Sequence, residues 1–175
     1  MQTFHFVHEF QAPAMSTIFD AYFDPAFALV QDQEVEITER KVIEETASAT
    51  EYYRLCRVVP KRQLPAIFKP LVAGELHYTE ALRWFKNEHR MKLEIRPSLL
   101  KGRASFNVDY KLFDDGAAPR GWRRIRRVYE GNVAIDVPLL GGRIEKGVIA
   151  DMEGSLRTTA QSTQAWIDAN RPRPD

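Results

Sequence analysis

The first part of the chain alternates between apolar and polar positions and then changes to a helical spacing. In residues 3–11 the even positions are all phenylalanine apart from His8, a pattern that predicts a half-buried strand. After Pro13, apolar residues recur three and four positions apart in residues 14–23, and a second such stretch covers 26–31. The sequence therefore predicts a strand followed by two short helices.

A period of two returns between residues 35 and 137. The strands it predicts cover residues 35–47, 51–59, 75–85, 89–95, 103–113 and 122–137. Most of the connections are short enough for hairpins, which predicts an antiparallel meander. The apolar segment 60–74 interrupts the strands as a loop or short helix, and a change of parity near Val128 predicts a β-bulge in the last strand.

After Pro138 the apolar residues return to three- and four-residue steps over about 30 positions, which predicts one long amphipathic helix ending near Asn170. Residues 171–175 are expected to form a frayed tail. Together these elements predict a single α+β domain over residues 1–170, in which a curved antiparallel sheet of about seven strands wraps around a long C-terminal helix.

Composition narrows the range of functions. The 175 residues include 25 Lys and Arg against 24 Asp and Glu, so the formal charge of +1 argues against a general nucleic-acid binder. Because Cys56 is the single cysteine, neither an intramolecular disulfide nor a cysteine-based zinc site is expected, and a reducing cytoplasm is the predicted location. The four histidines form no metal motif, and no signal peptide or apolar run of membrane length is present. We expect no metal and no cofactor.

A residue-level resemblance appears in residues 131–146, Gly-Asn-Val-Ala-Ile-Asp-Val-Pro-Leu-Leu-Gly-Gly-Arg-Ile-Glu-Lys. This segment resembles the last strand and helix start of the START-like, or SRPBCC, superfamily. It is most similar to a bacterial family of unknown function that ends in a strand, Val-Pro-Leu-x-Gly-Gly-Lys/Arg-Ile-Glu-Lys and a long helix. Element order extends the resemblance to the whole chain. The resemblance implies a helix-grip fold with an apolar cavity between sheet and terminal helix. Because the superfamily includes lipid carriers, plant ligand binders, polyketide cyclases and ring-hydroxylase subunits, the fold does not choose among these functions.

Large side chains on the predicted inner parities would either line that cavity or form an ordinary core. They are Phe6, Tyr53, Tyr78, Trp84, Phe106, Tyr110, Trp122, Met152 and Leu156. Three polar residues, His8, Arg57 and Glu80, fall on the same faces. Since a buried charge needs a partner, Glu80 with Arg57 or His8 is predicted to form a polar patch, which would orient a ligand headgroup, act as acid and base, or be purely structural.

The leading hypothesis is binding or transport of a hydrophobic, lipid-like small molecule without catalysis. The apolar residues predicted to gate the cavity are Leu64, Ile67, Phe68 and Leu71. A cyclase- or hydrolase-like enzyme using Glu80 or His8 as acid or base is the alternative, and a protein-interaction module is a third reading.

Residues 120–127 contain five arginines and a tryptophan. One interpretation is transient contact with an anionic membrane surface. The arginines that would make it are Arg123, Arg124, Arg126 and Arg127. The other is cross-strand pairing with the glutamate-rich residues 34–45.

Overall fold

The structure of the chain, a computed structural model, describes residues 1–61, 76–98 and 102–170. In chain order the elements are β1 (Gln2–Ala12), α1 (Met15–Phe23), α2 (Pro25–Glu34), β2 (Ile37–Ala47), β3 (Glu51–Pro60), β4 (Tyr78–Phe85), η2 (Lys86–Glu88), β5 (Arg90–Pro97), β6 (Ala104–Ala117), η4 (Pro119–Gly121), β7 (Arg123–Ile135) and α3 (Gly141–Asn170). The predicted tail, 171–175, lies outside the described residues. So do the predicted gate residues, Leu64, Ile67, Phe68 and Leu71.

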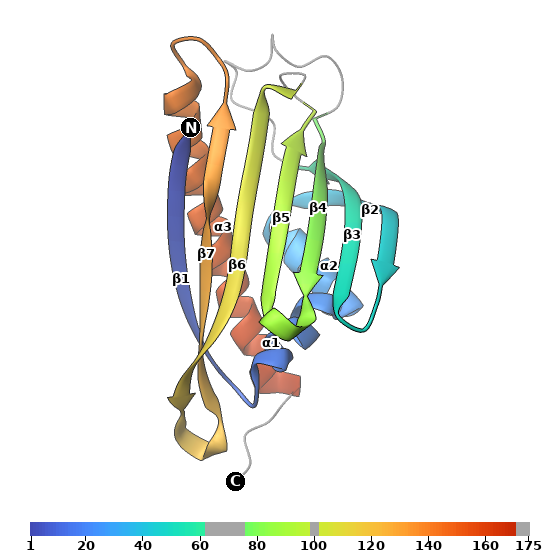
Figure 1. Cartoon of the computed structure of the whole chain (residues 1–175), viewed down its shortest axis with the longest axis vertical. Helices are drawn as coiled ribbons and strands as arrows, with labels where there is room; N and C mark the ends of the chain where they lie inside the picture. Colours follow the sequence, from blue (N-terminus) through green and yellow to red (C-terminus); the bar gives the residue numbers. More distant parts are fainter. Residues whose placement is uncertain (62–75, 99–101, 171–175) are drawn as a thin grey trace.

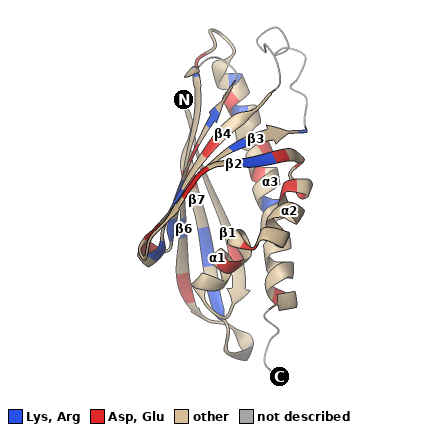
Figure 2. Cartoon of the chain, turned by 90° about the vertical axis from the view of Figure 1, so that its right-hand side faces the viewer, with Lys and Arg blue, Asp and Glu red and all other residues tan. Residues whose placement is uncertain are grey.

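The strands form one antiparallel sheet in the order β1-β7-β6-β5-β4-β3-β2. From β2 to β7 each strand pairs with the next along the chain, as expected of a meander, and β1 adds to the far side of β7 (Figure 1). The sheet curves, and α1, α2 and α3 all lie on its concave face (Figure 2). This arrangement confirms the predicted α+β helix-grip architecture.

Local sequence explains the two short helices. Pro25 occupies the first turn of α2, where a missing backbone N–H costs little. The preceding Asp24 caps this helix, because its Oδ1 accepts a hydrogen bond from the Phe27 amide at 2.7 Å. In α1, Ile18 and Phe19 are fully buried against the sheet. Both helices are therefore anchored in front of the same face of the sheet.

The long helix α3 spans 30 residues, about 45 Å at the usual rise. Its fully buried side chains lie near its ends, with Glu145 close to the start and Thr163 and Ile167 close to the end. Between them, Met152 and Leu156 pack against the core while remaining partly exposed. The middle of the helix is therefore less tightly covered than its two ends.

The segment that resembles the START-like superfamily closes the fold at the junction of β7 and α3. A Cβ atom added to Gly131 would lie 2.0 Å from the Asn107 carbonyl oxygen, and one added to Gly141 would lie 2.3 Å from that of Ile135. The buried Glu145 accepts a hydrogen bond from the Ile135 amide at 2.8 Å. These residues thus position the helix against the strand.

The bulge predicted near Val128 is wrong. Strands β1 and β7 keep an unbroken register from Gln2 opposite Val133 to Ala12 opposite Arg123, and the irregularity lies instead in the β6–β7 pairing, between Asp114 and Ala117. Alternation consequently runs without a break through β7.

Candidate functional site

A cavity of about 170 Å³ lies between the inner face of the sheet, α2 and α3. Its lining combines three arginines, Arg40, Arg54 and Arg127, with three tyrosines, Tyr22, Tyr110 and Tyr129. Met91, Leu93 and Leu156 contribute apolar surface. The lining thus combines apolar side chains with cationic and phenolic ones.

Most of the residues predicted to line a cavity are on the concave side of the molecule. Tyr110 and Leu156 line this cavity directly. Several others share the inner face of their strands or pack against the core without belonging to its lining. They are Phe6, His8, Tyr78, Glu80, Trp84, Phe106, Trp122 and Met152.

Tyr53 and Arg57 were expected on the inner face, and that expectation is wrong. Register with β4 places Arg54 opposite Leu82 and Cys56 opposite Glu80, so the even positions of β3 face the helices. Tyr53 and Arg57 therefore project from the opposite face. The misassignment follows from the sequence of β3, which carries apolar residues on both parities.

Glu80 is buried on the inner face, but its partner is neither Arg57 nor His8. The Arg40 guanidinium donates to Glu80 Oε1 at 2.6 Å and makes a bidentate contact with Asp32 of α2, with Nε at 3.1 Å from both carboxylate oxygens. The two carboxylates favour the charged guanidinium enough to raise the pKa of Arg40, although its burial acts in the opposite direction. Arg40, Asp32 and Glu80 therefore form a three-membered ionic cluster, of which Arg40 and Asp32 line the cavity.

Arg127 is also buried, with 3% of its surface exposed. Its guanidinium carbon lies 4.6 Å from the ring centroid of Phe10, 5.0 Å from that of Tyr129 and 6.0 Å from that of Tyr110. Within the described part of the chain no carboxylate pairs with Arg127 or with Arg54. Cation–π contacts with these rings thus offset much of the free-energy cost of burying the charge of Arg127.

Three hydrogen-bond donors of the cavity residues have no partner among the described residues. They are Nε of Arg54, the hydroxyl of Tyr110 and Nε of Arg127. Burial raises the pKa of Tyr110 well above its ordinary value, even though Arg127 opposes the shift, so this phenol stays protonated and able to donate. Unpaired buried donors are rare in folded proteins, and here three of them belong to residues that line one cavity.

His8 lies on the inner face of β1, directly opposite Arg127 on β7. Burial, together with the positive charges of Arg127 and Arg157, lowers the pKa of His8 to about 4. The ring is therefore neutral at pH 7, and its pKa is far from the value near 7 that suits acid–base catalysis.

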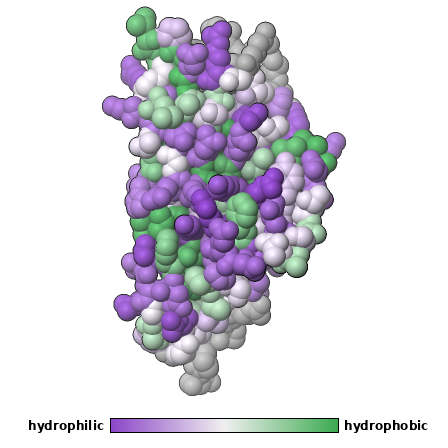
Figure 3. Space-filling view, viewed as in Figure 1, coloured by the Kyte–Doolittle hydropathy of each residue, from purple (hydrophilic) through white to green (hydrophobic). Residues whose placement is uncertain are grey.

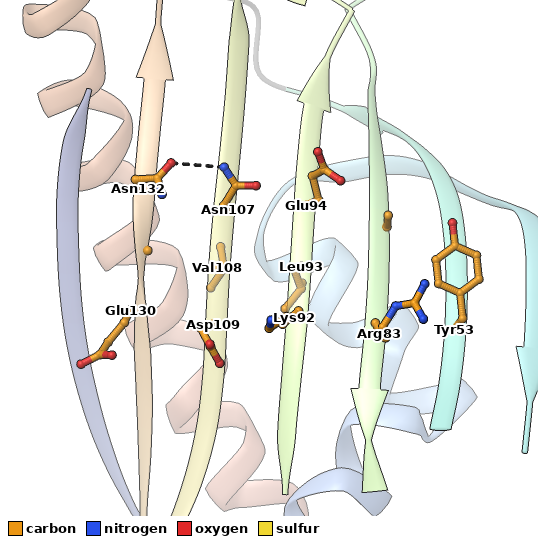
Figure 4. A pocket seen from close by; sticks show the side chains of 12 residues that line it. Tyr53, Arg83, Lys92, Leu93, Glu94, Asn107, Val108, Asp109, Glu130 and Asn132 are labelled. Carbon is orange, nitrogen blue, oxygen red and sulfur yellow. Dashed lines mark hydrogen bonds between the residues drawn. The ribbon is translucent and has the colours of Figure 1, made fainter. Parts of the chain in front are cut away.

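The outer face of the sheet carries a larger, open groove of about 560 Å³. Hydrophilic side chains cover much of this face (Figure 3), and those lining the groove come from β3 to β7 (Figure 4). Several pair with neighbours: Asn107 donates to Asn132 at 3.2 Å, and Arg83 donates to Glu51 at 2.5 Å. Mutual pairing of this kind is typical of a solvated surface.

The arginines of residues 123–127 are divided between the two faces of β7. Arg127 points into the core, so its predicted contact with a membrane is wrong. Arg123 pairs with Asp114 at 2.9 Å, and Arg126 pairs with Asp115 at 2.8 Å, while Arg124 is exposed. Pairing with residues 34–45 is also wrong, because β2 and β7 are separated by four strands.

Most of the polar residues that line the cavity were not expected from the sequence. Arg54 shares parity with Tyr52 and Cys56, and Arg127 shares parity with Tyr129, so both could have been found by continuing the alternation. Arg40 lies in a strand charged on both faces, where parity carries no signal. In the described residues no cluster of three or more His, Cys, Asp or Glu could hold a metal ion, and no helix is long and apolar enough to span a membrane.

A model of the family described as "Protein of unknown function (DUF2505)" matches residues 5–167. Among curated proteins, no sequence matches the chain.

Solved structures share the fold at low identity. One is TTHA0849 from Thermus thermophilus, with a TM-score of 0.62 and 12% identity over 97% of this chain and 99% of that chain. Another is the Zhui aromatase/cyclase from Streptomyces sp. R1128, with a TM-score of 0.61 and 8% identity over 95% and 94% of the two chains. A START superfamily protein from Mycobacterium smegmatis gives a TM-score of 0.53 and 10% identity over 95% and 97%. The predicted START-like fold is thereby confirmed.

Proposed function

The chain belongs to the family of proteins of unknown function DUF2505, and from its fold and cavity we propose that it binds or carries a hydrophobic small molecule without catalysing a reaction. The ligand would be lipid-like in having an apolar body and a polar end. It would occupy the cavity between the sheet, α2 and α3.

The observation that carries this proposal is the mixed lining of the cavity. Leu156, Met91 and Leu93 offer apolar contact, and three arginines and three tyrosines line the same cavity. Ligand pockets in proteins commonly combine apolar walls with a few convergent polar groups that fix the orientation of the ligand. The START-like fold, which typically encloses hydrophobic ligands, agrees with this reading.

Glu80 and His8, the two side chains suggested as acid or base, are not placed for proton transfer in the cavity. Glu80 is held in an ion pair by Arg40, and His8 has a pKa of about 4 and is not among the lining residues. Binding therefore accounts for the geometry better than proton transfer.

The cytoplasm, a reducing compartment, suits the free thiol of Cys56.

Substitution of Leu156 by Trp tests the proposal, because the larger side chain would fill the cavity from α3. Indole, a neutral aromatic probe, is titrated into the protein and followed by saturation-transfer NMR. We expect the wild type to bind indole and Leu156→Trp to bind it at least about tenfold more weakly, the equivalent of about 1.4 kcal/mol. The matched control is Leu29→Trp, on the exposed side of α2, where the side chain is 66% exposed.

Native mass spectrometry of the wild type purified from its own host provides a second readout. A small molecule that accompanies the wild type and Leu29→Trp, and is absent from Leu156→Trp, supports the proposal. If Leu156→Trp folds and binds indole as well as the wild type does, the cavity is not the binding site.

A further inference from the structure

We propose that Arg127 and Tyr110, assisted by Arg54, hold the carboxylate of a small monocarboxylic acid in the cavity. This inference rests on the proposed function and specifies the polar end of the ligand. It is carried by the charges, the unpaired donors and the size of the cavity.

The charges around the cavity do not balance. Arg40, Arg54 and Arg127 contribute three positive charges, while Asp32 and Glu80 contribute two negative charges, so one positive charge is in excess. Both carboxylates are engaged by Arg40, which leaves Arg127 without an anionic partner among the described residues. A buried cation is costly unless it is paired, so a ligand with one negative charge would complete the site.

The donors that lack partners are of the kind that binds a carboxylate. A guanidinium donates several hydrogen bonds in a fixed plane, and a neutral phenol donates one more. Nε of Arg127 and the hydroxyl of Tyr110 are both buried and unpartnered, and Nε of Arg54 is a third such group on the same cavity. A carboxylate has two acceptor oxygens and can accept from Arg127 and Tyr110, while Arg54 adds a positive charge to the same lining.

The aromatic rings around Arg127 fix the position of its guanidinium. Phe10 and Tyr129 lie within 4.6 and 5.0 Å of the guanidinium carbon, and Arg127 Nη2 lies 3.5 Å from the carbonyl oxygen of Leu156. These contacts come from β1, β7 and α3. Because the cation is held in place before a ligand arrives, little ordering is required on binding.

The volume limits the part of the ligand that enters. The cavity measures about 170 Å³, near the roughly 150 Å³ of an engineered protein cavity that binds benzene, and below the roughly 300 Å³ at which drug-sized pockets begin. One aromatic ring or a short branched chain with its carboxylate matches this space. Benzoate is therefore a probe of suitable size, and benzamide is its neutral counterpart of nearly the same shape.

The first measurement compares these two probes with the intact chain by saturation-transfer NMR at pH 7. We expect benzoate to bind at least about tenfold more tightly than benzamide, because charge-assisted hydrogen bonds are stronger than neutral ones. Equal affinity for the two probes overturns the proposal.

The second measurement uses a substitution that removes a single oxygen atom. Tyr110→Phe retains the ring and loses the hydroxyl, so we expect benzoate to bind about tenfold more weakly while benzamide changes less. Tyr53→Phe, the same change on the outer face, should leave both affinities unaltered. If the two variants bind benzoate equally well, Tyr110 does not hold the carboxylate and the proposal fails.

Arg127→Lys provides a further test, since it keeps a positive charge and removes the planar fork. We expect this variant to lose benzoate affinity, with folding checked by circular dichroism. Indole distinguishes the two proposals: if indole binds and benzoate does not, the carboxylate site is wrong and the cavity stands. If neither indole, benzoate nor benzamide binds, both proposals are wrong.

Discussion

Arg40 on the edge strand β2 donates a hydrogen bond to Glu80 on β4 at 2.6 Å, reaching across the intervening strand β3. Beneath this contact Cys56 of β3 pairs with Val42 on one side and with Glu80 on the other. Because Arg40 also binds Asp32, the same guanidinium connects the edge of the sheet, its middle and helix α2. The edge strand is thus attached to the body of the protein by ionic contacts in addition to its ladder with β3.

The first prediction concerns this cluster. Glu80→Gln should lower the free energy of unfolding by roughly 1–3 kcal/mol, because it removes one partner of a largely buried ion pair. Urea denaturation followed by circular dichroism measures the change. The control is Glu94→Gln on the outer face, where the contact with Arg96 is exposed to solvent and should contribute less than about 0.5 kcal/mol. Equal effects of the two substitutions would contradict a structural role for the buried cluster.

Alternation was sufficient to predict most of the fold, since hydrophobic burial on one face of a sheet imposes a period of two. Strands β5 and β6 show this clearly: Met91 and Leu93 face the helices, as do Val108 and Tyr110. The long helix followed from its own spacing. Glu80 was also assigned to the inner face correctly, because β4 has apolar neighbours on that parity.

The candidate site could not be predicted to the same extent, because its lining is charged. Arg127 lies in the same alternating series as Tyr129, yet a buried arginine without a carboxylate partner is too rare to be expected from sequence. The change of parity between Trp122 and Tyr129 predicts a bulge near Val128, which the register of β7 with β1 does not contain. The sequence of β3 is ambiguous in parity, because Arg57 shares parity with Leu55 and Val59 while Arg54 shares parity with Tyr52 and Cys56. That ambiguity is resolved by the register with β4, which depends on pairing distant in sequence.

The second prediction concerns the close approach of β6 and β7. Gly131→Ala should destabilise the protein by more than about 2 kcal/mol, because its Cβ would lie 2.0 Å from the Asn107 carbonyl oxygen and the backbone would have to move. Gly154→Ala in α3 is the matched control. No atom lies within 4 Å of a Cβ placed there, so helix propensity should make that variant more stable by about 0.5–1 kcal/mol. Thermal denaturation of both variants tests the pair, and an unchanged melting temperature for Gly131→Ala would refute the close approach.

The third prediction concerns acid stability. The pKa of His8 is about 4 in the folded protein and near 6.5 in the unfolded chain, so the unfolded chain binds more protons between these values. The contribution of His8 to the free energy of unfolding is therefore fully present above pH 6.5 and is lost as the pH falls towards 4. We expect the free energy of unfolding to fall by about 1–2 kcal/mol over this range. This is less than the full pKa shift would give, because the His8 ring is only half-buried.

His8→Gln should remove this part of the pH dependence. The measurement is urea denaturation at pH 7.5 and at pH 4.5 for the wild type, His8→Gln and His5→Gln. His5 lies on the outer face of the same strand and contacts Glu130 at 2.9 Å, so its variant controls for the loss of an imidazole. A wild type and a His8→Gln variant that lose the same stability over this range would show that His8 does not carry the effect.

The fourth prediction concerns the thiol of Cys56, which is the single cysteine of the chain and has no exposed surface. Burial raises the pKa of the Cys56 thiol, so the reactive thiolate is scarce in the folded protein as well as inaccessible. We expect dithiobis-nitrobenzoate at pH 8 to label the folded protein at least about a hundredfold more slowly than the protein in urea.

Glu80→Gln should accelerate labelling of the folded protein, because Cys56 lies under the contact between Arg40 and Glu80 and becomes reachable when β2 separates from β3. The control variant Glu94→Gln should leave the labelling rate unchanged. Rapid labelling of the folded wild type, or identical rates in the wild type and Glu80→Gln, would show that the ionic cluster does not hold the edge strand in place.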